Sequence, residues 1–225
     1  MRRSHLLRWQ TGVAVAGVTA LVAVSSCVVP QQGPATYSAP ELRARIVDSR
    51  TNEPVAGAVV FADWLVWGQA VQPAHGASSF DTFHRAEATS DATGSFVIPA
   101  WGPETRPFYR RLDYAFTPRL HVFKADYYPR ILVNERNVSP DTSIVTSEWS
   151  GKTIRLDRFE SDDWMKYVHD LDRMMWSESP LHPCQCPQMA AAIYADWERV
   201  RPLLPPDVQR RVIGPRGYPW PGSTR

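Results

Sequence analysis

The sequence has little of what usually supports catalysis. Its 225 residues include only three cysteines: Cys27, Cys184 and Cys186. It has no Gly-x-Ser-x-Gly elbow, no His-Glu-x-x-His zinc motif and no glycine-rich phosphate loop. These absences remove the common sequence evidence for a serine hydrolase, a zinc protease or a nucleotide-dependent enzyme. We therefore expect a protein that is not an enzyme and that needs no cofactor and no resident metal.

The first 40 positions contain no acidic residue. Arg2, Arg3 and Arg8 make this end positive, and residues 12–24 are almost all Ala, Val, Leu and Gly. Such a layout is typical of a secretory signal peptide. Its ending, Val24-Ser25-Ser26-Cys27, resembles the lipobox of bacterial lipoproteins. The resemblance implies a signal peptide over 1–26 and a mature N-terminus at Cys27 carrying acyl chains such as palmitate.

Two other interpretations of this segment stay open. The uncharged run Gly12–Val29 has 18 residues, the lower limit for a membrane-spanning helix, so a spanning anchor is one alternative. Ordinary cleavage without lipidation is the other. If the lipoprotein interpretation holds, Val28 after the cysteine favours the outer membrane, with the protein facing the periplasm. The expected location is then the bacterial cell envelope.

The net charge of +2 comes from the leader. Three of the 25 basic residues lie in the signal peptide, so 22 remain against 23 acidic residues in the mature chain. Net charge therefore gives no support for binding to nucleic acid or to an anionic membrane. We expect no nucleic-acid partner, and a membrane contact only through the lipid anchor.

Alternating apolar and polar residues predict an all-β central domain. The segment 27–40 is rich in Pro, Gln and Gly and is expected to be a tether, with ordered structure starting near Glu41. Short alternating stretches follow at 42–47, 55–62, 88–98, 120–128 and 152–156. Several such strands separated by turn residues are typical of a mainly β, antiparallel β-sandwich, which we place at 41–159.

Three motifs in this region resemble those of the carboxypeptidase regulatory-like (transthyretin- or prealbumin-like) domains. They are Ile46-Val47-Asp48-x-x-Thr51-x-Glu53-Pro54-Val55-x-Gly57, then Thr89-x-Asp91-x-x-Gly94-x-Phe96, and Leu120-x-Val122 through Tyr127. Asp126 stands where the family usually has Gly. The resemblance implies a seven-stranded prealbumin-type sandwich that binds or supports other molecules without chemistry of its own. The motif His84-Arg85-Ala86-Glu87 spells a zinc-like His-x-x-Glu but falls where the sandwich needs a strand.

Two connections look longer than such a sandwich requires. The segments 63–83 and 101–118 are expected to be loops rich in aromatic residues, and the second also contains Arg106, Arg110 and Arg111. Rings can stack on sugars and guanidinium groups can hold carboxylates. The candidate ligand-binding residues are Trp64, Trp67, Trp101, Tyr109 and Arg110. The alternative is that individual rings cap the ends of the sandwich core.

The pattern changes to a helical period after Phe159. Residues Trp164, Val168, Leu171 and Met175 form one face, and Met189, Ile193, Trp197 and Val200 repeat it after Pro187. This predicts a two-helix extension over 160–213, ended by prolines, and a flexible tail at 214–225. Between the helices, Cys184 and Cys186 are expected to be either a short-ring disulfide or a thiol pair without a function. A redox pair, a metal site with His182 and intermolecular disulfides stay open.

These observations favour a non-catalytic envelope lipoprotein whose sandwich binds an envelope ligand, such as a glycan, or a protein partner. A thiol- or metal-handling protein using Cys184 and Cys186 is the second hypothesis. A purely structural assembly protein is the third.

Overall fold

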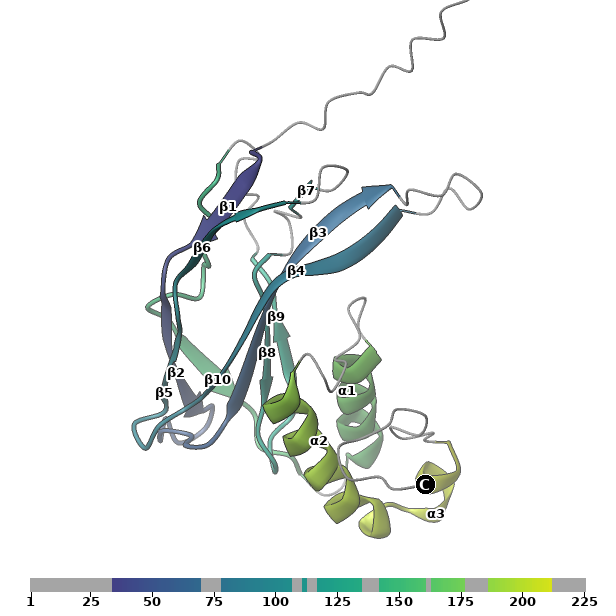
Figure 1. The fold of residues 1–225 in the computed structure, drawn as a ribbon. Helices are drawn as coiled ribbons and strands as arrows, with labels where there is room; N and C mark the ends of the chain where they lie inside the picture. Colours follow the sequence, from purple (N-terminus) through teal and green to yellow (C-terminus); the bar gives the residue numbers. More distant parts are fainter. Residues whose placement is uncertain are drawn as a thin grey trace, which may run out of the picture. The chain divides into compact units, whose positions relative to one another are not determined.

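The computed structural model describes residues 34–69, 78–106, 111–112, 117–134, 142–160, 163–176 and 186–211. All of them belong to one compact unit, Gln31–Arg225. This unit is mainly β, with two β-sheets stacked on each other and helices on the outer face of one of them (Figure 1). The predicted sandwich with a C-terminal helical extension is confirmed.

The first sheet has three strands in the order β10 (Thr153–Leu156), β2 (Leu42–Asp48), β5 (Ser95–Ile98). Strands β2 and β5 are antiparallel, with Leu42 opposite Ile98. Strand β10 instead runs parallel to β2, with Ile154 opposite Ile46. The expectation of antiparallel pairing is therefore wrong for this pair. A parallel neighbour needs a long crossover, and the chain between β2 and β10, which contains the strands of the second sheet, supplies it.

The second sheet has the order β4 (Ser78–Thr89), β3 (Val59–Gln69), β8 (Arg119–Phe123), β9 (Arg130–Leu132), and β7 (Arg111–Leu112) pairs with β3 beyond the end of β8. Strands β1 (Thr36–Ala39) and β6 (Trp101–Thr105) form a separate antiparallel pair. The structure therefore moves several element boundaries that were predicted from the sequence. Most of the expected loop 63–83 is the long hairpin β3–β4, and ordered structure begins at β1 rather than at Glu41, because Tyr37 is fully buried there.

The main hydrophobic core lies between the two sheets. Each strand contributes every second residue, as a half-buried strand must. The three-stranded sheet supplies Leu42, Ala44, Ile46, Phe96, Ile98, Ile154 and Leu156. The facing sheet supplies Val60, Ala62, Trp64, Val66, Leu120, Val122 and Leu132. Alternation predicts the inward residues of the three-stranded sheet, whereas Trp64, Val66 and Leu132 of the facing sheet lie outside the strands expected from the sequence.

A second core lies on the opposite face of the second sheet. Helices α1 (Trp164–Trp176) and α2 (Pro187–Val200) cover Val59, Phe61 and Phe123. The predicted start of α2 at Pro187 is confirmed, and its apolar face is buried as expected: Met189, Ile193, Trp197 and Val200. On α1 the buried face includes Tyr167 and Met174 as well as Val168 and Leu171.

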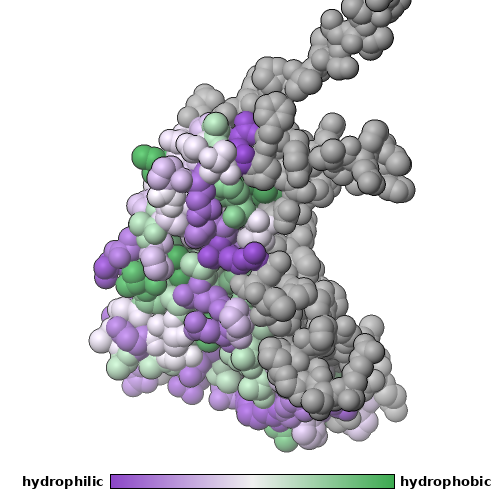
Figure 2. All heavy atoms as spheres, in the orientation of Figure 1, coloured by the Kyte–Doolittle hydropathy of each residue, from purple (hydrophilic) through white to green (hydrophobic). Residues whose placement is uncertain are grey.

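Helical structure continues beyond the prolines that follow α2, where the sequence predicted its end. A 3₁₀ turn (Arg201–Leu203) leads into α3 (Pro206–Arg211), because proline fits the first helical position. Among the described residues, no helix is long and apolar enough to cross a bilayer. On the coloured part of the face in Figure 2, hydrophilic and hydrophobic residues are interspersed. The exposed large apolar side chains are scattered: Ile144, Met165, Tyr194 and Leu203.

Candidate functional site

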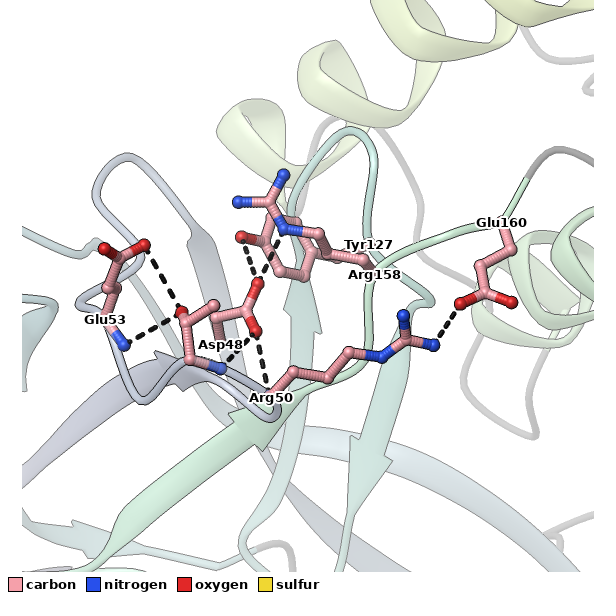
Figure 3. A network of polar contacts seen from close by, with 7 residues as sticks. Asp48, Arg50, Glu53, Tyr127, Arg158 and Glu160 are labelled. Atoms are coloured by element: carbon pink, nitrogen blue, oxygen red, sulfur yellow. Dashed lines mark hydrogen bonds and ion pairs between the residues drawn. The ribbon is translucent and has the colours of Figure 1, made fainter.

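The first family-like motif builds a turn around the buried carboxylate of Asp48 (Figure 3). Its Oδ1 accepts hydrogen bonds from the backbone N–H groups of Arg50 (2.9 Å) and Thr51 (3.1 Å). Its Oδ2 accepts from Arg158 Nε at 2.7 Å and from the Tyr127 hydroxyl at 3.1 Å. Arg158, together with these N–H groups, holds the pKa of Asp48 well below its usual range.

The other motif residues also form turns. Asp91 Oδ1 accepts from the Thr93 and Ser95 N–H groups at 2.8 and 2.9 Å. Gly94 has φ +76°, and a Cβ there would lie 2.2 Å from the Ile46 carbonyl oxygen, so only glycine fits. Asp126, the departure from the family pattern, has φ +68° and so adopts the conformation for which glycine is favoured. These motif residues form the turns between strands of the sandwich.

Three ionisable side chains lie together on the face of the second sheet that packs toward the helices. Asp63 on β3 and Arg119 on β8 are directly opposite, and Arg119 donates from Nε to Oδ1 (3.2 Å) and from Nη2 to Oδ2 (2.8 Å). His121 Nε2 lies 3.6 Å from Asp63 Oδ1, and its ring contacts Phe61. Burial opposes ionisation of Asp63, but His121 and Arg119 outweigh it and lower the pKa of that carboxyl. Asp63 is therefore a buried carboxylate.

This cluster was not predicted from the sequence. The strand predicted at 55–62 ends before Asp63, and the strand predicted at 120–128 begins after Arg119. Asp63, Arg119 and His121 are the polar members of the alternation along β3 and β8, but all three are buried. Their face of the sheet carries the helical layer, which is a tertiary contact that strand periodicity does not contain. The signal in the sequence that could have indicated the cluster is Asp63, an acidic residue inside the otherwise apolar run 59–67.

The N-terminus of α2 is bound to the sheet through Glu87. Its carboxylate accepts from the N–H groups of Gln188 (3.0 Å) and Met189 (2.8 Å), which are among the unpaired donors that begin every helix. His84 lies on the same strand, but residues three apart on a strand point to opposite faces. His84 instead pairs with Glu104 at 2.9 Å and stacks on Trp101. The His-x-x-Glu sequence therefore does not bring its two side chains together.

Cys186 precedes α2 and is fully buried. The redox alternative depends on stabilisation of a Cys186 thiolate by the helix N-terminus, but burial raises the pKa of the Cys186 thiol to about 12. This weighs against the redox hypothesis, because the thiolate is the reactive form. Cys27, His182 and Cys184 lie outside the described residues, so lipidation and the disulfide stay predictions. The described residues contain no group of three His, Cys, Asp or Glu side chains placed to hold a metal ion.

The predicted ligand-binding rings have different positions. Trp64 and Trp101 are 1% and 8% exposed and pack edge to face, 5.3 Å between ring centroids. They are part of the core, so the prediction that their faces bind a ligand is wrong, and the capping alternative applies to both. Trp67 lies on β3, and only its backbone is described. Tyr109 and Arg110 lie outside the described residues.

A pocket of about 240 Å³ nevertheless lies beside Trp64, between the β1–β2 turn and the segment 145–150. Its apolar walls include Leu42, Trp64, Pro118 and Val145, and exposed Glu41 and Ser150 also line it. The indole Nε1 of Trp64 is buried and has no hydrogen-bond partner. Buried donors are rarely left unpaired, because each one costs the free energy of its lost hydration.

The segment that closes this pocket is fixed by Asn134. Its Nδ2 donates to the carbonyls of Thr117 (2.8 Å) and Thr146 (3.0 Å), and its Oδ1 accepts from the Glu148 N–H at 3.0 Å. Asn134 is buried. The pocket is therefore bounded by a wall that hydrogen bonds hold in place, and it is not a gap beside a loose loop.

No family model and no curated protein matches the chain. Among solved structures, the chain is similar to a 3-chlorocatechol 1,2-dioxygenase from Rhodococcus opacus, with 15% identity, a TM-score of 0.26 and 57% of this chain covered. A 9R-lipoxygenase from Cyanothece has 14% identity, a TM-score of 0.26 and 80% coverage. A hydroxyquinol 1,2-dioxygenase from Pseudomonas putida has 15% identity, a TM-score of 0.24 and 68% coverage. The chain spans 61%, 27% and 69% of these three proteins, and the similarity is too remote to bear on function.

Proposed function

We propose that this protein is a non-catalytic lipoprotein of the bacterial cell envelope, anchored by acylated Cys27, whose prealbumin-like sandwich binds a small envelope ligand. The pocket beside Trp64 is the observation that carries this proposal. It combines a partly open, mostly apolar space with the buried indole donor of Trp64, which has no hydrogen-bond partner. Ligand sites usually have this composition: apolar walls and a few polar groups that fix the orientation of the ligand.

The size of the pocket limits the ligand. About 240 Å³ is the space of roughly eight water molecules, which is enough for one ring-sized group and not for a large cofactor. The Trp64 Nε1–H requires an acceptor, and the apolar walls require a weakly hydrated face. A single sugar ring has both, since its ring face is apolar and its oxygens accept hydrogen bonds. A saccharide unit of an envelope glycan is therefore the ligand class that we favour.

Ligand-observed NMR with a panel of monosaccharides and muropeptide fragments tests the pocket. Ser150→Trp puts a large ring beside the pocket at an exposed position, so binding should be lost while the fold is kept. Trp64→Phe keeps the wall but removes the N–H, and should weaken binding about tenfold, the value of one hydrogen bond to a buried donor. Ala191→Trp, at an exposed position on α2, is the matched control and should bind like the parent protein.

The outcomes that count against the proposal are concrete. Saturation transfer that persists in Ser150→Trp would place binding elsewhere, and no binding by any member of the panel would remove the saccharide assignment. The anchor is tested separately by metabolic labelling with palmitate. Label should enter the parent protein and be absent from Cys27→Ser; label in both would exclude Cys27 as the acylated residue.

A further inference from the structure

The outward face of the three-stranded sheet is rich in positive charge. In β2 the residues Leu42, Ala44 and Ile46 point into the core, so the alternate residues Arg43 and Arg45 point to solvent. Strand β10 repeats the pattern, with buried Ile154 and Leu156 and exposed Arg155. Lys152, immediately before β10, is also exposed. Four cationic side chains therefore lie on one sheet face, although the mature chain has almost no net charge.

A shallow groove of about 380 Å³ runs across this face. It is lined by parts of β2, β5 and the start of β10, and its charged members are Arg43, Arg45 and Lys152. No acidic residue is among its lining residues. The hydroxyl-bearing residues Ser95 and Thr153 line it as well. The groove therefore has the composition of a surface that accepts anionic oxygen atoms.

The local partners of these cations leave donors available. Arg45 uses Nε to donate to the Thr93 carbonyl at 3.0 Å, which occupies one of the five N–H groups of a guanidinium. Lys152 Nζ lies 5.3 Å from the centroid of the Trp149 ring, a contact that takes up no N–H donor. Arg43 pairs with Glu41, but both side chains are largely exposed, and such pairs are weak and easily exchanged.

We infer that this face, defined by Arg43, Arg45, Lys152 and Arg155, docks on the phosphates of anionic phospholipid headgroups. Its cations are spread over a sheet, about 6.7 Å apart along a strand and about 4.8 Å between strands at the Cα atoms, and they do not converge on one point. Such a spread suits a surface of many phosphates. Guanidinium groups also bind phosphate oxygens in pairs.

The short tether between Cys27 and the sandwich supports a membrane as the partner of this face. If Cys27 is acylated, as the proposed function holds, only eight residues lie between it and the start of β1 at Thr36, which is nine Cα–Cα steps along the chain. Even fully extended, that tether reaches about 30 Å, so the sandwich stays close to the bilayer. The local charge of one face, and not the net charge of the chain, would then select how the sandwich lies on the membrane.

Co-sedimentation with vesicles tests this inference. The chain from position 27 on, carrying Cys27→Ser, removes the anchor and leaves the compact unit that starts at Gln31. It should bind vesicles containing phosphatidylglycerol and not vesicles of phosphatidylcholine alone. Each cation near an anionic surface contributes about a fivefold gain in partitioning, so Arg43→Gln/Arg45→Gln should weaken binding by about 25-fold. Glu41→Gln removes the competing carboxylate and should strengthen it.

The matched control removes the same net charge elsewhere. Arg173 on α1 and Arg201 after α2 are exposed, so Arg173→Gln/Arg201→Gln should bind within about twofold of the parent. Equal losses in the two double variants would show a net-charge effect and overturn the inference, as would binding to both vesicle types alike. Displacement by millimolar inorganic phosphate would show a single-anion site instead of a membrane surface. None of these results depends on the Trp64 pocket, so failure here and failure of saccharide binding are distinguishable.

Discussion

Asp63 and Arg119 face each other across β3 and β8 and are joined by two hydrogen bonds in a fully buried position. A buried ion pair is costly to break, because the remaining partner keeps its charge without compensation. Asp63→Leu and Arg119→Leu should each lower the free energy of unfolding by about 3–5 kcal/mol. The double variant should lose less than the sum of the two, since it leaves no unpaired charge. Urea unfolding of the parent protein, the two single variants and the double variant gives a double-mutant cycle. Strictly additive losses of unfolding free energy would show that the two side chains do not interact.

His121 completes that cluster. Its ring is fully buried, and neither ring nitrogen has a hydrogen-bond partner. Its Nε2 lies 3.6 Å from Asp63 Oδ1, and His121 and Arg119 together lower the pKa of that carboxyl.

Asp48 predicts how stability depends on pH. The pKa of its carboxyl in the folded protein lies below the ordinary value of 3.8, so the folded state holds the charged form more strongly than the unfolded chain does. The resulting stabilisation is present in full above pH 3.8 and is lost as the pH falls below that value. Asp48→Asn should therefore be less stable than the parent protein at pH 7, and the difference should shrink by pH 3. Thermal unfolding at the two pH values measures it, and a constant difference would exclude the linkage.

The sequence predicted what depends on local pattern. Alternation predicted the inward residues of the three-stranded sheet, and Pro187 with its apolar spacing predicted α2. The pattern was less informative where one strand has two buried faces: β3 continues through Asp63 and Trp64 because the facing sheet covers one side and the helices the other. The Trp64 pocket also could not be predicted, because its walls come from segments far apart in the chain. Only the packing of β3 against the 145–150 segment brings them together.

Asp126 tests the one departure from the family-like motifs. At φ +68° an L-residue with a Cβ is strained, and glycine is not. Asp126→Gly should therefore leave the free energy of unfolding unchanged or raise it by up to about 1 kcal/mol, even though it removes the exposed ion pair with Arg199. Asp126→Ala should lower it by about 1 kcal/mol, and Asp126→Asn, which tolerates this conformation, should lie between them. An alanine variant as stable as the glycine variant would show that the turn is not strained.

Glu87 connects the two parts of the fold, because a β4 side chain accepts the first N–H groups of α2. Helix N-caps contribute about 0.5–2 kcal/mol, and here the same contact also attaches the helix to the sheet. Glu87→Ala should lower the free energy of unfolding by about 1–2 kcal/mol and speed hydrogen exchange at Gln188 and Met189 more than in the strands. Glu87→Gln keeps the acceptor oxygen and should lose only the part that comes from charge at a helix N-terminus, about 0.5 kcal/mol. Equal losses in the two variants would assign the whole effect to charge and none to the cap.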